Sequence, residues 1–230
     1  MKKFIPILAY HSLDPQRFPG KLAIAPELFK RQMSFLKKKG FRVTGLEACA
    51  KSGWKEDLLD RQVAITLDDG YLDNYERAFP ILKEMGFAAA FFVTPAEVGL
   101  PGFMTWEMVR EMAATPGIEI GSHSLHHKPL ADIPEKEAWE SVVISKKILE
   151  DKLGHEIKAI SYPSGSFNEK ILEMVRGAGY RYGCAASHIH DRKWEGDPYL
   201  LRRIKISSSS GSDLAFSLRL SGFYHSFGRP

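Results

Sequence analysis

Asp69, His123 and His127 have the side-chain types of a divalent-metal site. His123 and His127 are four residues apart, so one helical turn would place both imidazoles on the same side, a spacing that suits two ligands of one ion. With Asp69 they form a two-histidine, one-carboxylate set that leaves coordination positions open for water and substrate. A cluster of histidines can also simply lie exposed on the surface, but the apolar strand expected at 118–120 argues against that interpretation. His126, in the same cluster, should point elsewhere.

Asp68 directly precedes Asp69 in the run Thr66-Leu67-Asp68-Asp69-Gly70. Two adjacent carboxylates after an apolar strand repel each other and are costly to desolvate, and a nearby cation would offset that cost. Asp68 would then lie beside a metal ligand, where a general base for a metal-activated water belongs. Because Asp-Gly is a common turn signal, the run alone indicates a turn more often than a site.

The elements that must position these groups alternate between strand-like and helix-like segments. This alternation with short connections predicts a parallel sheet closed, or nearly closed, into a barrel. In such a barrel the loops that follow the strands share one face, so polar clusters far apart in sequence should converge there. Strands are expected at 5–10, 41–44, 62–67, 87–93, 118–120, 159–162, 180–186 and 200–206, and helices at 26–39, 72–85, 105–114, 134–153 and 168–177, with a last short helix after 207–212.

Composition narrows the class of protein. The 230 residues are 44% hydrophobic and 26% charged, as in an ordinary globular protein, and no linker divides them, so we expect one domain over 1–230. The net charge of +4 is too small and too scattered to indicate nucleic-acid binding. Cys49 and Cys184 match no metal or redox spacing and are expected as free thiols in or near the core. No pattern indicates an oligomeric state.

No segment is long and apolar enough to predict a membrane span. The apolar run after Lys2 and Lys3 is too short for a signal peptide and has no small-residue cleavage site, so it is interpreted as the first strand. As the sequence stands, a cytoplasmic location is expected, or an extracellular one if an export signal was removed.

Several motifs, spread over residues 5–206, resemble a known family. Thr66-Leu67-Asp68-Asp69-Gly70 resembles the Thr-Phe-Asp-Asp-Gly motif of polysaccharide deacetylases, the NodB-homology domain of carbohydrate esterase family four. His123-Ser124-Leu125-His126-His127 is similar to that family's His-Ser/Thr-x-x-His motif. Segments 7–12, 105–106, 121–123 and 197–204 resemble the branch that contains biofilm poly-N-acetylglucosamine deacetylases. The resemblance implies a distorted (β/α) barrel of the NodB-homology type.

The resemblance also implies a role for each matching residue. Asp69, His123 and His127 would bind Zn²⁺, or alternatively Co²⁺, Ni²⁺ or Fe²⁺. Asp68 would be the general base that deprotonates the attacking water. The family's oxyanion-stabilising backbone N–H falls in the segment matching Ser161-Tyr162-Pro163-Ser164-Gly165, where the N–H of Ser164 is the candidate.

Two family features have no direct match. The arginine that orients the base in the family is Ser161 here; Arg203 is the candidate substitute, and the alternative is a surface arginine on a strand. The family's Leu-x-His motif, which supplies the general acid, is also missing. His11 at the end of the first strand is the better candidate and His225 the other, while His11 could instead bind or orient substrate without donating a proton.

Aromatic and histidine residues outside these motifs receive weaker predictions. Trp106, Phe167 and Trp194 are expected in the core, and only Tyr162 is expected to stack on a sugar ring. His188, His190 and Asp191 are expected in a solvated loop.

The function predicted from the sequence is metal-dependent removal of N-acetyl groups from N-acetylamino sugars, in a polysaccharide, an oligosaccharide or a carrier-linked sugar. The alternatives are a carbohydrate-binding domain of this fold that has lost activity and a metal-dependent hydrolase of a non-sugar amide.

Overall fold

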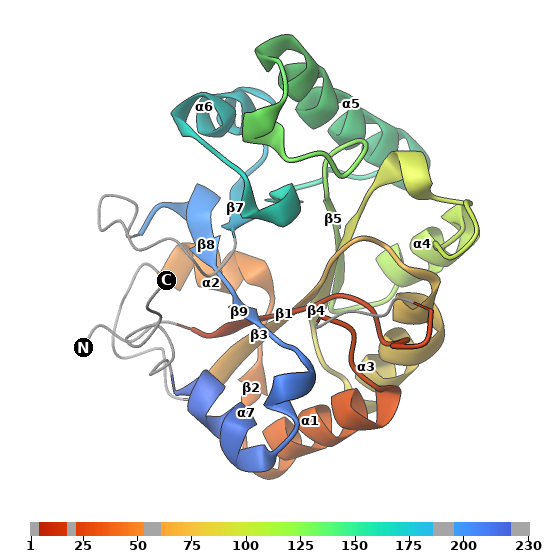
Figure 1. Ribbon diagram of the computed structural model, residues 1–230, viewed down its shortest axis with the longest axis vertical. Helices are drawn as coiled ribbons and strands as arrows, with labels where there is room; N and C mark the ends of the chain where they lie inside the picture. The colour runs from red at the N-terminus through yellow and green to blue at the C-terminus, as the bar shows by residue number, and fades with distance from the viewer. Residues whose placement is uncertain (1–4, 18–21, 53–60, 186–195, 222–230) are drawn as a thin grey trace.

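The computed structural model describes residues 5–17, 22–52, 61–185 and 196–221, and nine parallel strands in them form one sheet that curls into a nearly closed barrel (Figure 1). The sheet has the order β8-β7-β6-β5-β4-β3-β1-β9, with β2 paired to β3 off this path. This single-domain barrel is the predicted fold class. The strands are β1 (Ile7–Tyr10), β2 (Arg42–Val43), β3 (Gln62–Leu67), β4 (Ala89–Val93), β5 (Ile118–Ser122), β6 (Ala159–Ser161), β7 (Tyr182–Ala185), β8 (Leu201–Arg202) and β9 (Ile204–Lys205).

The barrel closes through a single residue. β8 pairs with β7 and β9 pairs with β1, so the two ends of the sheet are consecutive segments joined by Arg203. The prediction of one strand over 200–206 was therefore wrong. The first part of this segment hydrogen-bonds to β7 and the second part to β1, and this change of partner strand interrupts the strand at Arg203.

Helices surround the sheet (Figure 1), and they begin and end close to where the sequence indicates. Thr105 caps α4 by accepting from the Met108 N–H, and Asn168 caps α6 by accepting from the Ile171 N–H. The helices are α1 (Pro26–Lys38), α2 (Leu46–Ser52), α3 (Phe79–Met85), α4 (Trp106–Ala113), α5 (Glu135–Leu153), α6 (Glu169–Gly177) and α7 (Asp213–Leu220). α2 was not predicted.

The helix predicted over 72–85 contains a π-helical turn at Asn74–Ala78 before α3. Pro80 has no N–H to continue an α-helical ladder, and its ring would press on the carbonyl four residues earlier. A wider π turn relieves both problems, and such turns are frequent at functional sites. This turn places Asn74 against the end of β1, where its side-chain N–H donates to the His11 carbonyl.

Two apolar clusters hold the barrel together. One fills the layer between sheet and helices. The other fills the barrel interior and includes Phe92 and Tyr182 together with Leu46 and Cys49 of α2. α2 thus covers the N-terminal end of the barrel and leaves the other end to polar residues. Cys49 and Cys184 are buried free thiols, as predicted.

Candidate active site

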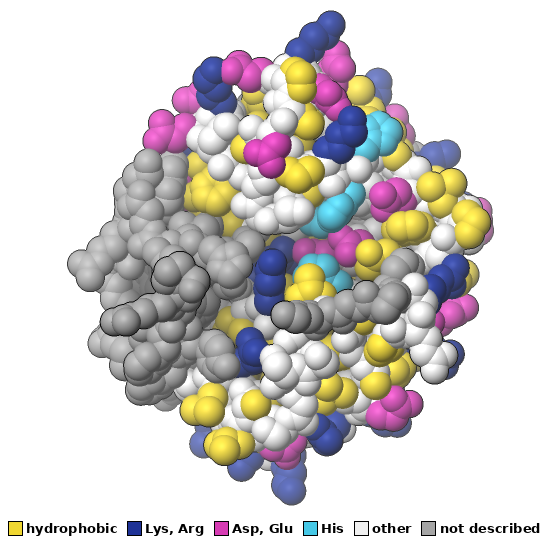
Figure 2. Space-filling model, in the orientation of Figure 1, with side chains coloured by type: hydrophobic (Ala, Val, Ile, Leu, Met, Phe, Trp, Pro, Cys, Tyr) yellow, Lys and Arg dark blue, Asp and Glu magenta, His cyan; other side chains and the backbone are white. Residues whose placement is uncertain are grey.

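A cavity of about 260 Å³ opens at the C-terminal ends of the strands. Histidine and carboxylate side chains gather at the centre of this face of the molecule (Figure 2). The cavity contains each site residue that the sequence singled out within the described ranges: His11, Asp68, Asp69, His123, His127, Tyr162, Ser164 and Arg203. The convergence follows from the parallel sheet, which brings the ends of β1, β3, β5 and β6 to one edge.

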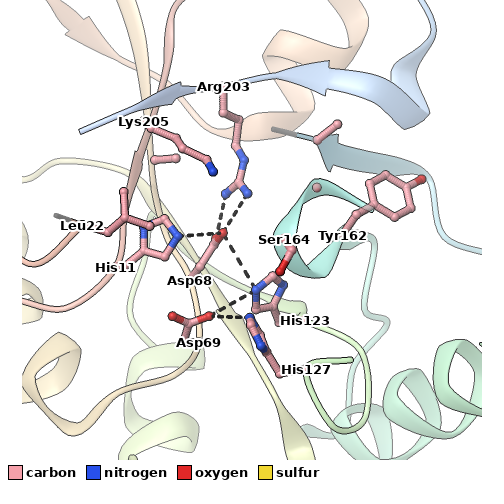
Figure 3. Close-up of a pocket in the computed structure, with 13 residues that line it drawn as sticks. His11, Leu22, Asp68, Asp69, His123, His127, Tyr162, Ser164, Arg203 and Lys205 are labelled. Carbon is pink, nitrogen blue, oxygen red and sulfur yellow. Dashed lines mark hydrogen bonds and ion pairs between the residues drawn. The ribbon is translucent and has the colours of Figure 1, made fainter. Parts of the chain in front are cut away.

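The three predicted metal ligands meet at one point (Figure 3). The Nε2 atoms of His123 and His127 lie 3.2 and 3.1 Å from Oδ1 of Asp69, and the three ligand atoms lie within 4.8 Å of one another. Asp69 and His123 are buried, whereas His127 is partly exposed at the cavity mouth.

His123 is held in the tautomer that a metal ligand needs. Its Nδ1 lies 2.8 Å from the Ser161 carbonyl oxygen, which can only accept, so Nδ1 carries the proton and donates it there. In the neutral ring the Nε2 lone pair then points toward Asp69 Oδ1. Asp69 Oδ1 is buried and lacks a hydrogen-bond donor within the described residues. An acceptor oxygen and an imidazole lone pair facing one another fit a bound cation.

The backbone that presents these ligands differs from the predicted one. Residues 124–126 form a turn instead of a helical turn, and Ser124 and His127 adopt left-handed conformations with φ of 62° and 55°. Asp69 and Ser164 are also left-handed, with φ of 74° and 55°. Such conformations are costly for residues with a side chain and tend to persist at functional sites. Here they turn the chain so that successive polar groups face the cavity.

Asp68 and Arg203 form a buried, doubly hydrogen-bonded ion pair. Arg203 Nη1 donates to Asp68 Oδ1 and Nη2 donates to Oδ2, both at 2.7 Å. Arg203 also donates to Thr66 Oγ1 at 3.1 Å and to Ser161 Oγ at 2.8 Å. The surface alternative for Arg203 is excluded because the residue is only 5% exposed. The small side chain of Ser161, at the position of the family arginine, leaves room for this guanidinium.

The ion pair keeps Asp68 in its charged form. Burial alone would raise the pKa of Asp68, but the Arg203 guanidinium and then the neighbouring His123 outweigh it and lower the pKa to about 2. For Asp69, burial also raises the pKa, while the adjacent imidazoles of His123 and His127 outweigh burial and bring the pKa well below its ordinary value. Both carboxyl groups are therefore ionised at neutral pH.

His11 lies across the cavity from the ligand triad. Its Nε2 is 4.0 Å from Asp68 Oδ2, and its Nδ1 is buried with no hydrogen-bond partner among the described residues. Burial lowers the pKa of His11, although Asp68 and Asp69 act in the opposite direction. Nε2, which faces Asp68 in the cavity (Figure 3), is therefore the His11 nitrogen that can exchange a proton there.

Tyr162 and Ser164 follow β6 in the short 3₁₀ turn Pro163–Gly165. The predicted stacking of Tyr162 on a sugar is wrong: its ring is 1% exposed and packs against Phe167, and its hydroxyl donates to the Tyr199 carbonyl. Tyr162 is a core residue that supports the turn. Ser164 lies in the cavity wall, as its predicted role requires.

The remaining predictions concern aromatic and histidine residues, some of which lie within the described residues and some outside them. Trp106 and Phe167 pack against the core, and His126 is exposed, as expected. Trp194, His188, His190, Asp191 and His225 lie outside the described residues.

Lys205 is a cavity residue that sequence reasoning missed. Arg203 and Lys205 are two residues apart on either side of Ile204, and residues two apart in an extended segment face the same side. The choice of Arg203 therefore already implied that Lys205 would face the cavity.

Comparison with known proteins identifies the family to which the chain belongs. A family model described as polysaccharide deacetylase matches residues 55–183, which are more than half of the chain. The chain therefore belongs to the polysaccharide deacetylase family.

Two relatives of known sequence are similar to this chain over most of its length. YxkH of Bacillus subtilis (strain 168), a protein named for the same family, is 31% identical over 210 residues, covering 90% of this chain and 74% of that one. A poly-β-1,6-N-acetyl-D-glucosamine N-deacetylase of Staphylococcus aureus (strain N315) is 27% identical over 201 residues, covering 82% of this chain and 69% of that one.

Two solved structures are similar over nearly their whole length. The Streptococcus pyogenes deacetylase PplD, in complex with acetate, has a TM-score of 0.83 at 25% identity, covering 96% of this chain and 99% of that one. IcaB from Ammonifex degensii has a TM-score of 0.80 at 25% identity, covering 94% of this chain and 97% of that one.

Within the described residues, the helices of the present chain are all too short or too polar to cross a membrane.

Proposed function

We propose that this chain is a metal-dependent deacetylase that removes N-acetyl groups from N-acetylamino sugars of a polysaccharide, an oligosaccharide or a carrier-linked sugar. The observation that carries the proposal is the convergence of Asp69, His123 and His127 beside the ionised Asp68. Relatives named as N-deacetylases of poly-N-acetylglucosamine support the choice of substrate class.

Asp69, His123 and His127 would hold one divalent ion, with Zn²⁺ favoured and Co²⁺, Ni²⁺ or Fe²⁺ as alternatives. When bound, such an ion supplies an acidified water and polarises the acetyl carbonyl. Asp68 accepts the proton of the attacking water because Arg203 keeps its carboxylate charged and fixed in orientation.

The oxyanion and the leaving amine then need partners of their own. The Ser164 N–H, in the cavity wall, donates to the oxygen that becomes negative as the carbonyl is attacked. His11 donates a proton to the departing amine, which would otherwise leave as an unstable anion. The sugar nitrogen must therefore lie on the His11 side of the cavity.

Metal analysis and acetate release test the proposal together. We expect the purified chain to bind about one divalent ion and to release acetate from β-1,6-linked N-acetylglucosamine oligomers when loaded with Zn²⁺ or Co²⁺. His123→Ala should lose most of the metal, whereas the exposed neighbour His126→Ala should keep it. Unchanged metal content in His123→Ala would refute the ligand assignment. Bound metal without acetate release from any acetamido sugar would refute the activity.

A further inference from the structure

Lys205 is a cation in the cavity wall that the proposed chemistry does not use. It lies on β9, opposite Ala9 of β1 in the strand register. The small Ala9 side chain leaves space beside the lysine, and Figure 3 shows the Lys205 side chain directed into the cavity near His11 and Arg203. The side chain is partly buried, so its charge is less screened than that of a lysine on the outer surface.

The backbone of Lys205 is fixed, although its ammonium group has no hydrogen-bond or ion-pair partner among the residues that the structure describes. Arg219 donates to the Lys205 carbonyl at 3.1 Å, and the next residue, Ile206, donates its N–H to Ala9 at 2.9 Å. Over the described ranges, no carboxylate lies within ion-pair distance of the Lys205 ammonium. The nearby carboxylate of Asp68 is already engaged at both oxygens by Arg203.

The charges of the cavity favour an anionic ligand. Its charged lining residues, within the described part of the chain, are Asp68, Asp69, Arg203 and Lys205, which balance one another. A divalent ion on Asp69 and the histidines would make the cavity net positive. A neutral acetamido sugar offers Lys205 only hydroxyl groups, whereas a phosphoryl or carboxyl group offers it a charge-assisted hydrogen bond.

We propose that Lys205 binds an anionic substituent, a phosphoryl or carboxyl group, carried on or next to the N-acetylated sugar. This inference rests on the proposed function, because it places the acetamido group at the metal and the anion beside β9. Lysine suits this task because its compact ammonium group has three donors and accepts oxyanions from several directions.

Equilibrium binding to the protein, both metal-free and loaded with its divalent ion, tests the inference apart from turnover. The probes are N-acetylglucosamine, N-acetylglucosamine 1-phosphate and N-acetylmuramic acid, so the last two separate phosphoryl from carboxyl recognition. We expect at least one anionic sugar to bind about tenfold more tightly than the neutral sugar. The preference should shrink as salt is raised.

Substitutions test whether the preference for anionic sugars depends on the Lys205 side chain. Lys205→Met should abolish it, Lys205→Arg should retain most of it, and Lys30→Met, which removes an exposed lysine of α1, should behave as the wild type. Thermal unfolding of each variant checks that the barrel is intact. Equal affinity of the wild type for all three sugars would overturn the inference, as would a preference that survives in Lys205→Met.

Kinetics of the metal-loaded enzyme separate this inference from the proposed function. We expect Lys205→Met to lower kcat/KM for the anionic substrate about tenfold more than for the neutral one, mainly through KM. Acetate release with no dependence on substrate charge would leave the deacetylase intact and remove the role of Lys205. Absence of acetate release from all substrates would remove the deacetylase, and the binding measurement would still decide on Lys205.

Discussion

Asp68 and Asp69 are neighbours in sequence with different partners in the fold. Asp69 faces two imidazoles, and Asp68 faces a guanidinium. The left-handed backbone of Asp69 makes this division, because it turns the second carboxylate toward β5 while the first remains in line with β3. Under the proposed function, this one dipeptide provides a metal ligand and a base.

Replacing Asp68 by asparagine tests the base. Asp68→Asn keeps the shape of the side chain but cannot take up a proton, so deacetylation should fall roughly 10²–10⁴-fold. Metal content should remain close to that of the wild type, since Asp69, His123 and His127 are unchanged. Acetate release and elemental analysis of the same preparation measure both, and full activity would remove Asp68 from the mechanism.

Replacing Arg203 tests the ion pair. Arg203→Met would leave the Asp68 carboxylate buried without its partner, which should cost about 3–5 kcal/mol of unfolding free energy and most of the activity. Arg110→Met breaks an exposed pair with Glu107 and should cost less than about 1 kcal/mol. Chemical denaturation measures both variants. Similar small losses in the two would contradict a structural role for the buried pair.

At the scale of elements, the π-helical turn connects β1 to the helical segment that follows β3. Asn74 is fully buried and donates from one amide nitrogen to the His11 carbonyl and to Asp73 Oδ1, both at 2.8 Å. Ser12 donates to the other oxygen of Asp73 at 2.6 Å. This network fixes the end of β1, and with it the direction in which His11 enters the cavity.

Asn74→Ala should therefore affect proton donation more than substrate binding. We expect turnover of acetamides, which need an acid, to fall more than turnover of 4-nitrophenyl acetate, which does not. Asn168→Ala is a matched control: it removes the cap of α6 and should cost about 1 kcal/mol without changing the ratio of the two rates. An unchanged ratio in Asn74→Ala would argue that His11 needs no such support.

Gly121 on β5 has no side chain, and this leaves room for the Phe92 ring in the barrel interior. A Cβ atom at Gly121 would lie 2.6 Å from the Phe92 ring and 3.1 Å from the Ala159 carbonyl oxygen, so Gly121→Ala should lower the unfolding free energy by about 1–3 kcal/mol. Gly45→Ala, where a Cβ atom would meet nothing within 4 Å, is the control. Denaturant unfolding compares the two, and rescue of Gly121→Ala by Phe92→Leu would identify the clash as the cause.

The sequence predicted the elements that depend on local signals. Capped helices such as α4 and α6 and the buried strand β3 appear where they were expected, since capping residues and apolar runs are read from neighbouring positions. The break between β8 and β9 was missed because it depends on which distant strand each half bonds to. The Asp68–Arg203 pair could be suggested only through a family resemblance, because no local pattern relates the two residues.

At the scale of the whole molecule, the two ends of the barrel differ in polarity and in their response to pH. Glu119 of β5 lies toward the end covered by α2 and accepts a hydrogen bond from the Tyr182 hydroxyl. Burial raises the pKa of Glu119, and the Tyr182 hydrogen bond opposes the rise. The folded protein therefore binds this proton more tightly than the unfolded chain does, and stability should fall as pH rises through the range between the two pKa values.

Glu119→Gln should remove that pH dependence. The variant should gain stability relative to the wild type as pH rises above the ordinary glutamate pKa, because the wild type must ionise a buried carboxyl group and the variant need not. Glu84→Gln alters an exposed carboxylate of α3 and serves as the control. Unfolding curves at several pH values measure the difference, and parallel curves for wild type and Glu119→Gln would contradict the assignment.

The position of Arg203 has a consequence for the order in which the protein becomes active during synthesis. The proposed metal ligands follow β3 and β5 in the sequence, so they are synthesised before β6, β7, β8 and β9. The partner of Asp68 arrives only after β8, at the residue where the last strands join the ring. Under the proposed function, a growing chain would thus have its metal ligands before it has the partner that orients its base. Hydrolysis would begin only when β8 and β9 have joined the sheet, so activity would mark the completion of the barrel.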